Sequence, residues 1–226
     1  MSLADEILNF YFSLPQTFSP PNAVEVIFPF DNPETRRVMK IFYRKYYDDG
    51  APRTLLFGIN PGRNGAGLTG IGFTDPILIE EKCGIANILE KRSELSASFI
   101  CDVVEAYGGP EVFYGDFLFS TVLPFGLLRK GKNYNYYDDK ETLAYFEPLI
   151  TESIGKQMAF PSIQRKIATV GQGKNLACLE RLNKQHGFFE SIEILPHPRW
   201  VMQYRRKEKE KYIEHYLDVL KRIKVH

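Results

Sequence analysis

Apolar runs alternate with amphipathic segments along most of the 226-residue chain. Four short runs, rich in β-branched and aromatic residues, predict buried strands at 54–58, 117–122, 167–170 and 191–195. Segments with apolar residues at helical spacing lie around them, at about 33–47, 95–107, 141–160, 174–185 and 202–223. Strands separated by helices are typical of a parallel sheet covered on both faces. We therefore expect an α/β fold: a three-layer α/β/α arrangement with a central, mostly parallel four-stranded sheet.

The N-terminal part of the chain predicts a helix after an irregular stretch. Residues 15–33 contain five prolines and read as an irregular connection. Asn32-Pro33-Glu34 is typical of a helix start, and Asp48-Asp49-Gly50 of its end. Pro148 predicts a kink or a break in the 141–160 helix. No internal repeat or low-complexity segment is evident, so we expect one domain over 1–226 with residues 1–50 as a helical cap segment within it.

Polar residues stand at three of the predicted strand ends. Asn60 follows the first strand, Ser120 and Thr121 end the second, and His197 follows the fourth. Because the carboxyl ends of parallel strands meet at one edge of a sheet, we expect these side chains to converge. The prolines on both sides of His197 restrict the backbone, which suits a hydrogen-bond donor that must stay in place. A surface histidine in a rigid turn is the alternative.

The segment after the first strand is rich in glycine. It reads GINPGRNGAGLTGIGF and ends at Phe73. Glycine loses much conformational freedom on folding, so we expect something to approach this backbone closely. No Gly-x-Gly-x-x-Gly runs into a helix and no Gly-Lys-Ser/Thr is present, which argues against a dinucleotide or nucleoside-triphosphate site. From residue types alone, a ligand loop and a plain turn both remain open.

Composition and net charge limit which classes of partner and which cellular compartment we expect. The net charge is only +1, so contact with nucleic acid must come from a local patch. The turn at 171–175 could bind a phosphate or be a plain tight turn, and the RRKEKEK run at 205–211 could be a solvated face. Three scattered cysteines indicate free thiols, and no histidine pair has metal-ligand spacing. We expect a monomeric cytoplasmic protein with no metal, no other cofactor and no membrane contact.

Several short strings resemble the uracil-DNA glycosylase superfamily, in particular its single-strand-selective monofunctional branch. They are GINPG at 58–62, TG at 69–70 with Phe73 after it, GKN at 131–133, and HPR at 197–199, which is a shortened form of the family's second motif. Their order agrees with the family over roughly residues 50–200. One departure stands at the end of the second strand, where the family carries a base-reading asparagine and this chain has Ser120-Thr121.

The resemblance implies a monofunctional DNA glycosylase that hydrolyses the N-glycosidic bond of uracil or another deaminated base, as in base excision repair. In this scheme Asn60 holds the attacking water, His197 donates a hydrogen bond to the leaving base, and Phe73 stacks on that base. A non-catalytic module that binds single-stranded or damaged DNA is the main alternative, and an enzyme of free nucleosides a weaker one. The further substrate-binding residues implied are Gly58, Ile59, Pro61, Gly62, Ser120 and Thr121, with the reading hydroxyl at Thr121 or Ser120. The DNA-binding residues implied are Thr69, Gly70, Lys132, Asn133, Gly171, Lys174, Arg199, Trp200 and Arg205.

Overall fold

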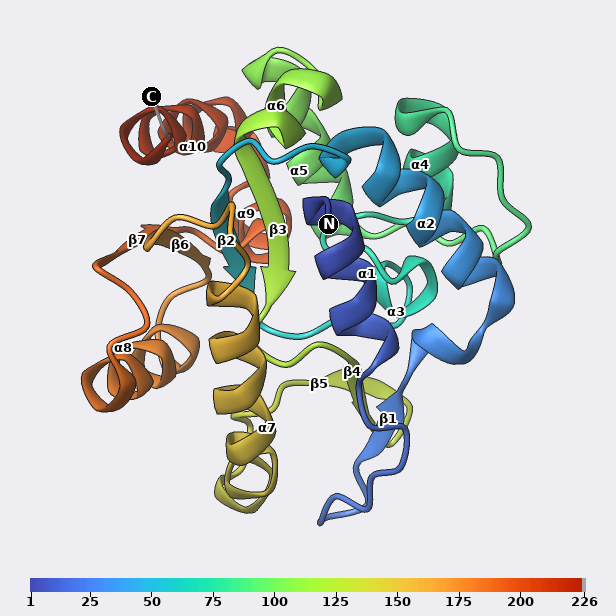
Figure 1. Cartoon of the computed structure of the whole chain (residues 1–226), viewed down its shortest axis with the longest axis vertical. Helices are drawn as coiled ribbons and strands as arrows, with labels where there is room; N and C mark the ends of the chain where they lie inside the picture. The colour runs from blue at the N-terminus through green and yellow to red at the C-terminus, as the bar shows by residue number, and fades with distance from the viewer. Residues whose placement is uncertain (225–226) are drawn as a thin grey trace.

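A four-stranded parallel sheet forms the centre of the molecule (Figure 1). The computed structural model describes residues 1–224, so the last two residues of the expected domain lie outside it. The strands are β2 (Thr54–Gly58), β3 (Phe117–Thr121), β6 (Lys166–Val170) and β7 (Ser191–Leu195), in the order β3-β2-β6-β7. Gly58 pairs with Thr121 and Val170 with Leu195, so the carboxyl ends are level. The predicted strands and their parallel sheet are confirmed.

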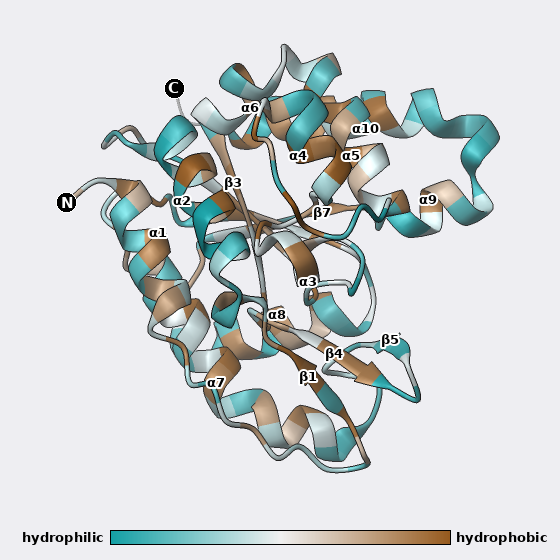
Figure 2. Cartoon of the chain, turned by 90° about the vertical axis from the view of Figure 1, so that its right-hand side faces the viewer, coloured by the Kyte–Doolittle hydropathy of each residue, from teal (hydrophilic) through white to brown (hydrophobic). Residues whose placement is uncertain are grey.

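Helices cover both faces of this sheet (Figure 2). On one side α5 (Leu95–Tyr107) packs on α10 (Lys209–Ile223) through Phe99 and Tyr216. On the other lie α1 (Leu3–Phe12), α7 (Lys140–Met158) and α8 (Lys174–His186). The three-layer prediction is therefore correct. Four shorter elements of these layers, α3 (Ala66–Thr69), α4 (Pro76–Cys83), α6 (Pro110–Asp116) and the 3₁₀ turn η1 (Pro29–Asp31), were not predicted.

The helix predicted at the N-terminal side forms as α2 (Pro33–Tyr47). The Asn32 side chain accepts hydrogen bonds from the backbone N–H groups of Glu34 and Thr35, as a helix cap does. Helix α7 continues through Pro148, so the predicted break is absent from this helix. Buried residues from Leu3 to Ile223 join one hydrophobic cluster, so the first 50 residues share the core with the sheet.

The prediction of one long last helix is wrong. The chain forms α9 (Pro198–Tyr204), a 3₁₀ turn η2 (Arg206–Glu208) and then α10. Residues 205–208 are exposed, so no buried face holds them in a continuous helix, whereas α10 buries one side. The segment after His197 is therefore a short helix of its own, α9, which begins at the next residue, Pro198.

A second, three-stranded antiparallel sheet was also not predicted. It contains β1 (Glu25–Ile27), β4 (Gly126–Arg129) and β5 (Lys132–Tyr134) in the order β1-β4-β5. Lys130 and Gly131 join β4 to β5 with φ angles of 50° and 68°, as a tight hairpin of this hand requires. Strand β1 lies within the stretch interpreted as irregular. Within residues 1–224, no helix is long and apolar enough to cross a membrane.

Candidate active site

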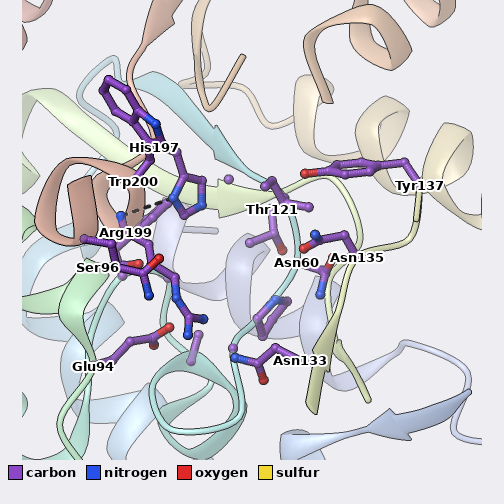
Figure 3. A pocket seen from close by; sticks show the side chains of 18 of the residues that line it. Asn60, Glu94, Ser96, Thr121, Asn133, Asn135, Tyr137, His197, Arg199 and Trp200 are labelled. Atoms are coloured by element: carbon purple, nitrogen blue, oxygen red, sulfur yellow. Dashed lines mark hydrogen bonds between the residues drawn. The ribbon is translucent and has the colours of Figure 1, made fainter. Parts of the chain in front are cut away.

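A pocket of about 350 Å³ lies at the carboxyl ends of the parallel strands (Figure 3). Its walls come from the glycine-rich loop after β2, the end of β3, the segment after β5, the start of α5, and α9. Eleven of the residues expected in the site line it: Gly58, Ile59, Asn60, Pro61, Gly62, Phe73, Thr121, Asn133, His197, Arg199 and Trp200. The structure therefore brings together strand ends that are far apart in the sequence.

Asn60 is held at both ends of its side-chain amide. Its Nδ2 donates to the carbonyl oxygen of Tyr134 at 3.1 Å, and its Oδ1 accepts from the backbone N–H of Tyr136 at 3.4 Å. These bonds fix which end of the amide is the acceptor. They also attach the segment after β5 to the loop after β2, so one residue shapes two walls of the pocket.

His197 caps helix α9 with its own ring. Nδ1 accepts the backbone N–H of Arg199 at 3.2 Å, so the proton of the neutral imidazole lies on Nε2. Burial, together with the positive charge of Arg199, lowers the pKa of His197 to about 4. The ring is therefore a neutral Nε2–H donor at physiological pH.

The turn that carries His197 is also anchored from behind. The buried Tyr216 of α10 donates its hydroxyl hydrogen to the carbonyl oxygen of Pro196. Gly171, at the end of β6, has a φ of 120°, and a side chain there would lie 3.4 Å from the His197 ring. The structure thus places Gly171 beside the histidine as a support. It does not line the pocket.

Phe73 forms one wall of the pocket on a strained backbone. Its φ is 55°, which is uncommon for a bulky residue. Its ring packs 4.9 Å from that of Phe119, and a side chain at Gly58 would approach it to 3.0 Å. The surrounding residues therefore hold the ring in its place at the pocket.

Thr69 and Gly70, expected to touch DNA, are both buried below this wall. The Thr69 hydroxyl lies 2.8 Å from that of Thr74 and accepts the Ile71 N–H at 3.2 Å. Gly70 ends α3 with a φ of 70° and packs against Met39. With 0% of its surface exposed, Thr69 cannot contact a DNA backbone in this conformation. Both residues shape the turn that leads to Phe73.

The end of β3 separates the two candidate reading residues. Successive side chains of a strand point to opposite faces. Thr121 shares the face of Phe119 and lines the pocket, whereas Ser120 lies on the other face, near the Tyr11 hydroxyl at 3.4 Å and hydrogen-bonded to Gln157. The expectation for Ser120 is therefore corrected: it belongs to a buried polar network between α1 and α7.

Glu94 is an acid that the sequence did not single out. Its carboxylate lies against Gly62 and Gly65 of the glycine-rich loop. Burial raises the pKa of Glu94 to about 7; Arg199 opposes this shift and Asp75 adds to it. The Arg199 side chain enters the same pocket (Figure 3).

Helix α9 gives the pocket an aromatic and basic rim. Trp200 and Tyr204 are 41% and 67% exposed and, with Gln203, line the opening. Trp200 meets Tyr212 of α10 edge-on at 5.8 Å, so it both anchors the helix and borders the pocket. Arg205 lies 5.4 Å over the Trp200 ring but does not line the pocket itself.

The other basic residues expected to meet DNA lie around the pocket. Lys132 lines a neighbouring hollow, which shares Asn133, Glu94 and Arg199 with the pocket. Lys174 is exposed, and its Nζ donates to the carbonyl oxygen of Tyr137 at 3.5 Å. These two cations are therefore near the opening without lining it.

Several lining residues were missed at the sequence level: Glu94, Ser96, Asn135, Tyr137, Gln203 and Tyr204. One signal was available, because the run NYNYYDD at 133–139 concentrates aromatic and amide side chains outside any predicted element. Glu94 and Ser96 stand at the start of α5, where polar residues are ordinary. Among residues 1–224, no three histidine, cysteine or acidic side chains form a group that could hold a metal ion.

Comparison with known proteins places this geometry in a family. The family model of the uracil DNA glycosylase superfamily matches residues 44–221. The crystal structure of SMUG2 from Pedobacter heparinus is 38% identical in sequence, with a TM-score of 0.93 over 98% of this chain and 97% of that one. A search among curated proteins finds no match. The chain belongs to the uracil-DNA glycosylase superfamily.

Proposed function

We propose that this protein is a monofunctional DNA glycosylase that hydrolyses the N-glycosidic bond of uracil or another deaminated base. The observation that carries this proposal is the placement of a neutral His197 donor and a fixed Asn60 amide in one pocket. Breaking the bond leaves negative charge on the base and positive charge on the sugar. Two groups are then needed: a donor for the base and an acceptor that holds water near the sugar.

His197 supplies the donor. As the bond breaks, charge develops on a carbonyl oxygen of the leaving base, and a fixed N–H directed at that oxygen stabilises it more than it stabilises the ground state. Because the lowered pKa of His197 keeps the ring unprotonated above about pH 5, the donor at neutral pH is the Nε2–H of a neutral imidazole. The two flanking prolines and the Tyr216 bond limit its movement.

Asn60 supplies the acceptor. The Tyr136 N–H uses one lone pair of Oδ1, and the second is available to a water molecule. An amide does not take up a proton as a carboxylate does, so Asn60 orients the water and the cation-like sugar attracts it. Of the described residues that line the pocket, none is a lysine, which supports hydrolysis by water over a Schiff-base route.

The substrate reaches this pocket only as an extruded nucleotide. Taking a base out of the stack costs a few kcal/mol, and that cost is lower for a damaged or unpaired base. In this proposal Phe73 offers a flat face to the base, and the cations Arg199, Lys132 and Lys174, which lie in or beside the pocket, contact the phosphate backbone. DNA is therefore the proposed partner, and no organic cofactor is required.

The test is cleavage of single-stranded and duplex oligonucleotides that carry one deaminated base, followed by alkali to break abasic sites. Asn60→Ala and His197→Ala should each lower the single-turnover rate about 10²–10³-fold, the loss typical of one preorganised group, with folding intact. A near-wild-type rate in either variant on every substrate would refute the role given to that residue.

A non-catalytic DNA-binding module is the second candidate. One observation favours it, because both ends of the Asn60 amide already have backbone partners, as in a purely structural asparagine. Under this alternative the wild-type protein binds the same oligonucleotides without cleaving any of them. The cleavage assay therefore separates the two functions.

A further inference from the structure

Tyr137 occupies a position in the pocket that suits contact with the base. It lies after β5 and lines the pocket together with Asn60 and Thr121. In Figure 3 its hydroxyl points from the wall of this segment toward the side where Thr121 lies. We infer that the Tyr137 hydroxyl is a second base-reading group, acting with the hydroxyl of Thr121. The inference rests on the proposed function and deepens it.

The position of Tyr137 is fixed by its neighbours. The preceding residue, Tyr136, is held by Asn60 through its backbone, and its hydroxyl donates to Asn175 Oδ1 at 2.7 Å. The Tyr137 ring meets that of Tyr136 edge-on at 5.0 Å, and its carbonyl oxygen accepts from Lys174. A ring placed in this way can present its hydroxyl to a ligand with little loss of freedom.

Four hydroxyl side chains line this pocket, those of Ser96, Thr121, Tyr137 and Tyr204, and none of them has a hydrogen-bond partner among residues 1–224. Thr121 is only 6% exposed, yet its Oγ1 has no protein hydrogen-bond partner, and the same holds for the half-buried Tyr137. Burial raises the pKa of Tyr137 to about 12, so the phenol stays neutral and keeps both its donor and its acceptor. Neither the Thr121 nor the Tyr137 oxygen is fully buried, so both are accessible in the pocket, and a bound base would bury and pair them.

A pair of hydroxyls matches the edge of a deaminated base. Such an edge presents a ring N–H next to a carbonyl oxygen, and one hydroxyl serves each atom. Because a hydroxyl both donates and accepts, the pair fits these two atoms in either order. Together the two hydroxyls replace a single side-chain amide and accept bases whose edges differ in detail.

The experiment compares Tyr137→Phe with the wild type. Losing one neutral hydrogen bond should lower single-turnover cleavage of a uracil-containing oligonucleotide about three- to tenfold. Affinity for the same oligonucleotide with a tetrahydrofuran abasic analogue should not change, since this ligand has no base. Tyr145→Phe on α7 is the matched control, because Tyr145 lies outside the pocket and 41% exposed, and it should cleave at the wild-type rate.

A double-mutant cycle adds an independent measurement. Thr121→Val removes the second hydroxyl with little change in shape, and its effect should not add to that of Tyr137→Phe, because both hydroxyls bind one base. Full cleavage by Tyr137→Phe, or an equal loss of affinity for the abasic ligand, would overturn the inference. A wild-type protein that cleaves no base would overturn the proposed function itself, and the inference would fall with it.

Discussion

Two regions that border the pocket, the glycine-rich loop after β2 and the segment after β7, are built in opposite ways. In the first, the glycines make room for the protein itself: Gly65 accommodates the Glu94 carboxylate, Gly58 the Phe73 ring and Gly70 the Met39 side chain. In the second, the polar and aromatic side chains of residues 199–206 are exposed, and four of them line the pocket: Arg199, Trp200, Gln203 and Tyr204. The first region is a packed framework, and the second is an exposed surface.

This difference changes the meaning of the glycine-rich sequence. The sequence predicts that something approaches the loop backbone closely, and the structure shows that protein side chains already do so. Substitutions in the loop should therefore act mainly on folding, whereas substitutions in α9 should act mainly on DNA binding.

The largest expected effect is on stability, from Gly65→Ala. The new Cβ would overlap the Glu94 carboxylate and lie 2.7 Å from the Thr74 carbonyl oxygen. Overpacking of this kind should lower the free energy of unfolding by about 3 kcal/mol. The control is Gly115→Ala in α6, where no atom lies within 4 Å of the added Cβ. Denaturant unfolding measures both, and equal midpoints would contradict the packed framework.

Glu94 should give the framework a pH-dependent stability. Its pKa is about 7 in the folded protein and 4.5 without burial, so the folded state holds this proton more tightly. Its contribution is complete below pH 4.5 and is lost as the pH rises to 7, by at most about 3 kcal/mol. Glu94→Gln should remove this loss. Unfolding measured across pH 4.5–8 checks it, and parallel curves for the two proteins would show that Glu94 does not titrate in this range.

The same contrast exists within one strand, at Ser120 and Thr121. Thr121→Asn places an amide in the pocket and should raise the preference for uracil over xanthine at least tenfold, since a fixed buried hydrogen bond discriminates strongly. Ser120→Asn instead inserts an amide into the buried network with Gln157 and should lower the melting temperature without changing this preference. Competition between the two substrates measures the preference. A changed preference in the Ser120 variant alone would reverse the assignment.

The smallest expected effect concerns salt. Arg199→Ala and Arg205→Ala should each remove about one phosphate contact and reduce the slope of log affinity against log salt by about 0.9 on duplex DNA. Arg165→Ala removes the same charge next to the amino end of β6, away from the pocket, and should leave the slope unchanged. Unchanged slopes in all three variants would place α9 away from the DNA.

The parallel sheet and the residues at its strand ends could be predicted from the sequence, because the patterns that indicate them lie within short segments. Apolar runs predict strands, and level carboxyl ends bring Asn60, Thr121 and His197 together. The partners Glu94 and Tyr137 did not follow, since their roles depend on the packing of α5 and of the segment after β5. The choice between Ser120 and Thr121 needed the strand register, which sequence counting left one residue uncertain.

The last helix shows the limit of pattern reading. Apolar spacing resumes at α10, but a histidine that caps α9 through its ring nitrogen has no sequence signature of its own. The second sheet was missed for a similar reason, because strands of three or four residues carry too few positions for a period to be recognised.

The hydrogen bond from the Tyr136 N–H gives Asn60, the residue proposed to hold the attacking water, a natural reporter. A backbone amide exchanges its hydrogen with solvent only while its bond is open. If Asn60 turns toward water during a reaction cycle, the Tyr136 amide is released and exchanges faster. If Asn60 keeps its place, that amide stays protected, so isotope exchange at one backbone position records the motion of a side chain in the pocket.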